Sequence, residues 1–322
     1  MDRKYFESLC KKPQMELKKY LTKQLQKQYS KVITGDGYVF AQGEVPILLV
    51  AHMDTVHDAA PSKFIYLDGK VSSPNGLGAD DRAGIYMITE IIKKHKCSVL
   101  FCEDEEVGCK GAGKFVKESF VLDLQFNYII ELDRKGSEDV VFYDCANKDF
   151  QEFITETGDW RLAHGSFTDI CTLAPVLGCA AVNFSCGYYL AHTKMEYLVM
   201  EETDKAIEKV CKLIERTKET DRFEWIEAPK ERFNYYGNLF SSYNYGFNYD
   251  GSYEEEVEEE YDDFVDKLYG IEYVDEDSEE AWEEVYAISE TEAIGKFLMA
   301  HPTIAFIDVK YVECFGEDPY MM

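Results

Sequence analysis

Short apolar runs alternate along the first two thirds of the chain with longer segments that repeat apolar residues at helical spacing. Three apolar runs, at residues 45–51, 98–102 and 128–132, are uninterrupted, which is typical of strands whose two faces are both covered. Two further candidate strands lie at residues 140–145 and 180–185. Shorter runs flank glycine-containing turns and predict two hairpins, at residues 31–41 and 64–73.

Helices are predicted where apolar residues recur every three or four positions between these strands. The segments lie at residues 14–28, 80–94, 149–157 and 201–217. The segment at 80–94 begins with two aspartates and ends with two lysines, as the helix dipole favours. Strands that alternate with helices predict an α/β fold, a three-layer αβα sandwich with a mainly parallel central sheet.

The pattern changes after residue 222. Residues 223–262 are rich in Tyr, Asn, Gly and Glu, show no sustained period and predict a linker. Beyond it, the residues at 281–289, 290–301 and 304–314 predict a strand, a helix and a second strand. We therefore expect a large domain over residues 1–222, a linker over 223–262 and a small acidic α+β, βαβ-like unit over 263–322.

Acidic side chains are concentrated in the C-terminal hundred residues. The whole chain has a formal net charge of −28, of which residues 223–322 carry −22 and residues 1–222 carry −6. This balance disfavours nucleic-acid binding through a basic surface. A basic partner is the more plausible ligand for the acidic region.

The composition also bears on location. No stretch approaches the ~20 apolar residues that a membrane helix needs, and residues 1–19 are charged, without the apolar core of an export signal. The ten cysteines form no CxxC pair, and many lie within apolar runs, where reduced thiols pack. We therefore expect a cytoplasmic protein with no membrane association.

Titratable residues follow the ends of the predicted strands. Because open α/β sheets bind ligands outside the carboxyl ends of their strands, we expect these side chains to share one site. Asp80 joins them from the start of a predicted helix, and His192 from a loop after the run at 180–185. The complete set is His52, Asp54, Asp80, Glu105, Glu106, Asp133 and His192.

These residue types agree with a two-metal centre. Two histidines and three carboxylates suit Zn²⁺, or Co²⁺ or Mn²⁺. Two such ions about 3.5–4 Å apart need a bridging carboxylate, and together they generate a hydroxide at neutral pH. A further carboxylate must take and return the proton, which accounts for consecutive glutamates at 105 and 106. Asp54 can accept from the second ring nitrogen of His52 and fix its tautomer.

Two alternatives remain open at this point. Glu131 lies two positions before Asp133, on the same side of the predicted strand, and competes with it as a ligand. Asp81, which follows Asp80, is better explained as an acidic residue in the first turn of a helix.

Five motifs occur in order along the chain: AHMDTV, GLGADDRAGIY, EDEEVGCKGAGKF, IIELDRKG and LAHTKMEYL. Together they resemble the co-catalytic zinc exopeptidases, a superfamily that includes bacterial aminopeptidases, peptidase T and glutamate-releasing carboxypeptidases. The resemblance spans residues 40–217. It implies that His52 and Asp133 bind one zinc, that Glu106 and His192 bind the other, and that Asp80 bridges both. It further implies that Glu105 is the general base and that Asp54 orients His52.

The spacing of the motifs favours compact members of this superfamily. Only 58 residues separate Asp133 from His192, and 27 separate His52 from Asp80. These intervals are too short for an inserted lid or dimerisation domain in addition to the required strands and helices. The chain therefore resembles the compact, lid-less aminopeptidases.

Residues 165–174, GSFTDICTLA, are similar to a segment that lines the substrate pocket of such aminopeptidases. The similarity implies a pocket role for Thr168 and Asp169. His164, in the same loop, is a candidate for holding an oxyanion over the site.

The sequence thus predicts a di-zinc aminopeptidase that hydrolyses the N-terminal bond of peptides, with Glu105 as general base for a metal-bridging hydroxide. An N-acyl amino acid deacylase or carboxypeptidase with the same ligands is the alternative within the enzymes. A non-catalytic scaffold, whose acidic C-terminal region binds a basic partner, is the alternative outside them.

Overall fold

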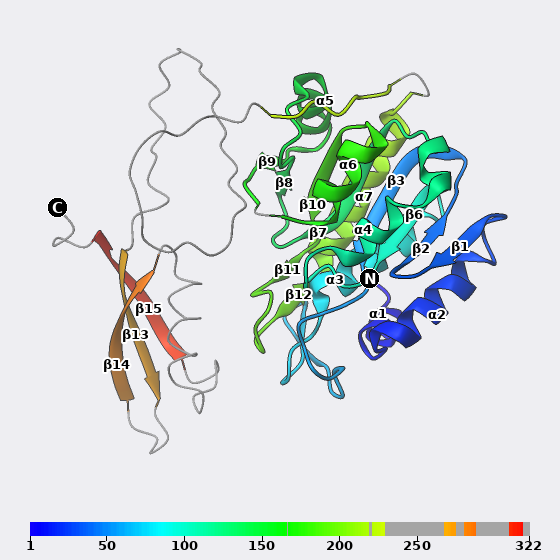
Figure 1. Cartoon of the computed structure of the whole chain (residues 1–322). Coiled ribbons are helices and arrows are strands. Elements are labelled where there is room, and N and C mark those ends of the chain that lie inside the picture. Colours follow the sequence, from blue (N-terminus) through cyan, green and yellow to red (C-terminus); the bar gives the residue numbers. More distant parts are fainter. Residues whose placement is uncertain (166, 219–220, 229–266, 275–279, 288–308, 318–322) are drawn as a thin grey trace, which may run out of the picture. The chain divides into compact units, whose positions relative to one another are not determined.

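The computed structural model describes residues 1–165, 167–218, 221–228, 267–274, 280–287 and 309–317. The chain divides into two compact units, Met1–Gly251 and Ser252–Met322 (Figure 1). No helix among the described residues is long and apolar enough to cross a membrane.

An eight-stranded mixed sheet forms the centre of the first unit. Its order is β1 (Val32–Gly35), β2 (Tyr38–Ala41), β6 (Cys97–Cys102), β3 (Val45–His52), β7 (Tyr128–Arg134), β10 (Ala181–Ser185), β8 (Asp139–Val141) and β9 (Arg161–Leu162). The four central strands, β6, β3, β7 and β10, run parallel to one another. β2 and β8 flank them as antiparallel neighbours.

Helices cover both faces of this sheet (Figure 1). One face packs against α1 (Arg3–Cys10), α2 (Gln14–Leu25), α3 (Ala79–Ile91), α5 (Lys148–Gly158) and α7 (Met200–Arg216). The other packs against α4 (Lys110–Phe115), α6 (Asp169–Leu177) and the 3₁₀-helix η1 (Ser119–Asp123). The predicted αβα sandwich with its mainly parallel centre is confirmed.

The alternation of side chains along β3 shows why the strand is apolar throughout. Ile47, Leu49 and Ala51 belong to the core under the larger helical layer, whereas Leu48 and Val50 belong to the opposite core. Successive side chains of a strand point to opposite faces, so a strand covered on both sides has no polar face.

A second, four-stranded sheet carries one side of the candidate site. Its order is β11 (Tyr188–Tyr189), β12 (Tyr197–Val199), β5 (Lys70–Ser72) and β4 (Ile65–Leu67). β12 pairs antiparallel with β5. The predicted hairpin at 64–73 therefore joins the hairpin that carries His192, and the two hairpins lie side by side.

The helix predicted at residues 80–94 is present as α3, but its dihedral angles become helical only after Asp81, whose side chain accepts the backbone N–H of Gly84 as a capping residue does. One strand prediction was too long. The strand predicted at 140–145 ends at Val141, and Tyr143 has a positive φ of 50°. Helices α1 and α6 were not predicted.

Residues 221–228 continue to pack on the first unit. The N–H of Phe223 donates to Asn127 O at 2.9 Å, and Phe223 O accepts from the N–H of Ala180 at 2.9 Å. The Phe223 ring also packs against Phe150. The chain thus remains attached to the α/β unit through Ala228, while the domain boundaries drawn from the sequence stay predictions.

The second unit contains an antiparallel sheet with the order β14 (Glu280–Ala287), β13 (Lys267–Val274) and β15 (Val309–Glu317). β14 coincides with the strand predicted at 281–289, and β15 overlaps the strand predicted at 304–314. β13, which lies between them, was not predicted. The helix predicted at 290–301 lies outside the described residues.

Gly84 is required where α3 crosses β7. A Cβ atom at this position would lie 1.7 Å from the backbone oxygen of Leu132. We expect Gly84→Ala to lower the free energy of unfolding by about 2–3 kcal/mol, since neither backbone can move aside without repacking the core. Thermal and urea denaturation of the metal-free protein measure this.

Gly113, inside α4, is the matched control because a Cβ atom there meets nothing within 4 Å. We expect Gly113→Ala to be neutral or to stabilise by about 0.4–1 kcal/mol. Equal effects of the two substitutions would contradict the close approach of α3 to β7.

Candidate metal centre

The side chains predicted to share a site converge at the carboxyl ends of β3, β6 and β7. Asp80 lies at their centre. Its Oδ1 is 3.0 Å from Nε2 of His52, and its Oδ2 is 3.1 Å from Nε2 of His192. One carboxylate thus presents an oxygen to each histidine, which is the arrangement that a bridging ligand requires.

Each histidine also faces a second carboxylate. Nε2 of His52 lies 3.4 Å from Oδ1 of Asp133, and Nε2 of His192 lies 3.0 Å from Oε1 of Glu106. The two groups meet at Asp80. Of the two rival residues on β7, Glu131 and Asp133, it is therefore Asp133 that the structure brings beside His52.

Ligand atoms close enough to share an ion occur in two overlapping groups among the described residues. One consists of His52, Asp80 and Glu106, and the other of His52, Asp81 and Asp133, with the ligand atoms of each group within 4.8 Å of one another. Asp81 was interpreted from the sequence as a helix N-terminal residue. Its oxygens accept the backbone N–H groups of His52 and Gly84 at 3.2 and 2.8 Å. Asp81 therefore connects the end of β3 to the first turn of α3.

The donor set fits divalent cations. Burial alone would lower the pKa of His52, but Asp133, Asp54 and Asp80 raise it well above its usual value. Hydrogen bonds to Asp80 and Glu106 raise the pKa of His192 to about 10. The protonated imidazoles thus balance the charge of the carboxylates, as bound cations would in the same place. Imidazole nitrogen together with carboxylate oxygen is the ligand set of Zn²⁺, Co²⁺ or Mn²⁺.

The two histidines differ in exposure. The side chain of His52 is 1% exposed, whereas that of His192 is 54% exposed. The His192 side of the candidate centre is therefore the more accessible to solvent.

A buried side-chain oxygen accepts the backbone N–H of four of the five ligand candidates. The distances are 2.9–3.2 Å, and the pairs are His52 with Asp81, Asp80 with Glu196, Glu106 with Asp54, and Asp133 with Asn183. Such contacts orient metal ligands and contribute to metal affinity. Sequence reasoning found Asp54 but missed the other three acceptors. Glu196, four residues after His192 in a quoted motif, offered the best signal.

Asp54 has two roles in this arrangement. Its Oδ1 lies 3.2 Å from Nδ1 of His52, where the sequence places it. The same carboxylate accepts the backbone N–H groups of Glu105 and Glu106 at 3.0 Å each. It therefore fixes the loop after β6 as well as the His52 ring.

Glu105 lies beside the ligands without facing a histidine nitrogen. Burial and the nearby carboxylates of Asp133 and Asp169, opposed by His52, together raise its pKa to about 9. The Cys109 thiol donates to Oε1 of Glu105 at 3.6 Å. Cations at the centre would lower this pKa toward the range of a general base.

The three residues predicted near the substrate differ in position. Thr168 is 1% exposed and donates to Oδ2 of Asp133 at 3.2 Å. Asp169 is fully buried, and burial raises its pKa to about 7 against the opposing effects of His52 and of a hydrogen bond with the Cys102 thiol. His164 is exposed. A pocket role for these residues stays a prediction.

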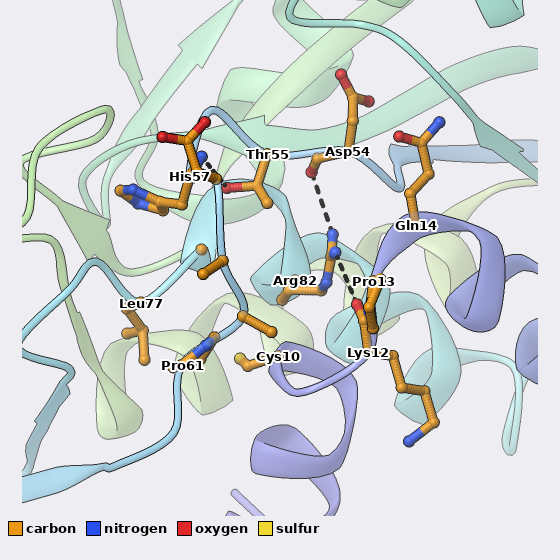
Figure 2. Close-up of a pocket in the computed structure, with 14 residues that line it drawn as sticks. Cys10, Lys12, Pro13, Gln14, Asp54, Thr55, His57, Pro61, Leu77 and Arg82 are labelled. Carbon is orange, nitrogen blue, oxygen red and sulfur yellow. Dashed lines mark hydrogen bonds between the residues drawn. The ribbon is translucent and has the colours of Figure 1, made fainter.

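A pocket of about 200 Å³ adjoins the candidate centre and is lined in part by Asp54, Thr55 and Arg82 (Figure 2). Arg82 is buried in its wall and donates to the backbone oxygens of Met53, Asp54 and Lys12 at 2.8–3.3 Å. The guanidinium thereby connects the end of β3 to the junction of α1 and α2, which fixes the segment that carries His52 and Asp54.

No family model and no curated protein matches the sequence. Solved structures share the fold. The aminopeptidase PepT of Bacillus cereus has a TM-score of 0.56 at 17% identity, over 66% of this chain and 96% of that chain. A tripeptidase of Staphylococcus aureus has a TM-score of 0.52 at 14% identity, over 65% and 95% of the two chains. An aminopeptidase of the archaeon Desulfurococcus kamchatkensis has 0.53 at 15% identity, over 66% and 94%. The resemblance predicted from the motifs is thus confirmed at the level of the fold.

Metal content tests the centre directly. After dialysis against trace Zn²⁺, we expect about two ions per chain in the wild type and fewer than about one in Asp80→Ala, since a bridging ligand serves both positions. Mass spectrometry of the protein gives the ratio. Asp36→Ala, an exposed aspartate whose side chain is 88% accessible, is the control and should keep both ions.

Metal uptake should also release protons. His192 has a pKa of about 10 without metal, so at pH 7.5 its imidazole holds a proton that must leave before Nε2 binds a cation. Affinity for Zn²⁺ should therefore rise as the pH increases from about 6 to 9. Calorimetry in buffers of different ionisation enthalpy counts the protons. Equal release by the wild type and His192→Ala would remove His192 from the ligand set.

Proposed function

We propose that this protein is a metallo-aminopeptidase that uses two Zn²⁺ ions to hydrolyse the N-terminal bond of peptides. The observation that carries the proposal is the position of Asp80, whose two oxygens lie 3.0 and 3.1 Å from Nε2 of two different histidines. The fold shared with aminopeptidases supports the same reading.

The ligands divide into two groups around Asp80. His52 and Asp133 would hold one ion, and His192 and Glu106 the other. When bound, the ions supply Lewis acidity to the scissile carbonyl and lower the pKa of water toward neutrality. Co²⁺ or Mn²⁺ would suit the same ligands.

Glu105 is the general base in this proposal. It takes the proton from the attacking water and delivers it to the leaving amine. Its position depends on Asp54, which accepts the backbone N–H of Glu105 at 3.0 Å and also contacts the ring of His52 at 3.2 Å. One carboxylate therefore keeps the base and a ligand at a fixed separation.

The shared fold guides the choice of substrate class. The solved structures that this chain resembles include aminopeptidases. We therefore favour an aminopeptidase over a deacylase or carboxypeptidase.

Two broader proposals go with this function. The nine cysteines of the first unit are all free, and eight of them are buried, which supports a reducing compartment such as the cytoplasm. The acidic region at 223–322 is proposed to bind a basic partner through its charge of −22.

Hydrolysis of a short peptide by the zinc-loaded protein tests the function. We expect cleavage of a peptide with a free N-terminus and none of its N-acetylated form. Glu105→Gln should lower kcat by about 10²–10⁴-fold while metal content stays at the wild-type level, because a general base contributes in that range.

Glu103→Gln is the matched control for this variant. Glu103 lies two residues earlier, and its carboxylate pairs with Lys18 at 2.8 Å. Full activity in Glu105→Gln would rule out the assignment of the base. Cleavage of the acetylated peptide alone would favour the deacylase.

A further inference from the structure

Glu196 is a fully buried carboxylate outside the predicted ligand set. It lies in the loop between β11 and β12, four residues after His192. A buried carboxylate is costly unless hydrogen bonds satisfy its oxygens, so the contacts of this side chain indicate why it is there.

Three donors satisfy the two oxygens of Glu196. Oε1 accepts the backbone N–H of Asp80 at 2.9 Å. Oε2 accepts the backbone N–H of Gly78, and it lies 3.2 Å from Nε2 of His57. Both oxygens are thus engaged by the backbone of the segment Gly78–Asp80 at the start of α3.

The turn is shaped to allow these contacts. Gly76 and Gly78 both have positive φ, at 94° and 68°, a conformation that glycine adopts without strain. A Cβ atom at Gly76 would lie 2.3 Å from the His57 ring. Glycine at position 76 therefore leaves the space in which His57 reaches Glu196.

Glu196 connects two ligand candidates, as Asp54 does, whereas Asp81 and Asn183 do not. Asp81 and Asn183 each accept the backbone N–H of one ligand candidate. Glu196 accepts that of Asp80 and belongs to the same loop as His192. It therefore ties the bridging carboxylate to the loop of the exposed histidine.

We propose that Glu196 is a positioning residue that sets the geometry of Asp80 and His192 at the second metal position, with His57 orienting its carboxylate. The inference rests on the proposed function, since it concerns the same metal centre. Hydrogen bonds from two backbone amides to one carboxylate are strong in a buried site. An amide in its place presents only one acceptor oxygen and leaves an N–H facing an N–H.

The test uses the full chain with Glu196→Gln, in which the side chain keeps its size. We expect Zn²⁺ affinity to fall about 10–100-fold, as for other residues that orient metal ligands. The weaker of two binding steps should change most. The d–d absorption of the Co²⁺-loaded protein should shift, because the ligands take a different geometry. Neither readout depends on turnover.

Glu201→Gln is the matched control. Glu201 is exposed and pairs with Lys205 at 2.9 Å, and its variant should bind metal with the wild-type affinity and spectrum. Melting of the metal-free proteins separates folding from positioning. An unchanged Zn²⁺ affinity and Co²⁺ spectrum in Glu196→Gln would overturn the inference.

His57 provides a second pair of variants in case Glu196→Gln does not fold. His57→Ala removes one donor from Oε2 of Glu196, and we expect an affinity loss of about threefold to tenfold, the worth of one hydrogen bond. His57→Gln retains a donor and should restore most of it. If neither variant changes affinity, the inference fails. If the wild type binds no metal, the proposed function fails instead.

Discussion

Asp80 presents one carboxylate oxygen to each of two histidines that lie 140 positions apart in the sequence. This contact requires the end of a central strand, the start of a helix and a hairpin loop to meet at one point. The two sheets together bring these three segments to one point. The large sheet supplies His52 and Asp133, and the small sheet brings the turn before α3 beside the loop of His192.

Hydrogen bonds from the backbone amides of four ligand candidates help to hold these residues in position. Buried oxygens of Asp54, Asp81, Asn183 and Glu196 accept the N–H groups of ligand residues. A hydrogen bond to the backbone fixes the origin of a side chain, so a ligand held in this way has few conformations left to lose when it binds. These side-chain oxygens also satisfy backbone N–H groups that form no hydrogen bond with a neighbouring strand.

The close approach of several carboxyl groups at the candidate centre disfavours their ionisation. Several carboxyl groups around the centre are buried together, and burial raises the pKa values of Asp133 and Glu105 to about 6 and about 9. Like charges at such distances oppose ionisation unless cations lie among them. The protonated imidazoles of His52 and His192 supply part of that charge without metal. Divalent ions would supply more and would stabilise the folded state in doing so.

The sequence by itself determined the layer architecture and grouped the candidate site residues. Uninterrupted apolar strands require cover on both faces, and titratable residues at their carboxyl ends must lie at one edge of the sheet, so His52, Glu106 and Asp133 could be grouped from their positions alone. Only the tertiary structure separated Glu131 from Asp133, because both lie on the same side of β7 and it is the carboxylate of Asp133 that lies 3.4 Å from Nε2 of His52. It also revealed Asp81, Asn183 and Glu196 as supports. Their function lies in hydrogen bonds to the backbone of distant segments, and a backbone N–H has no signature in the sequence.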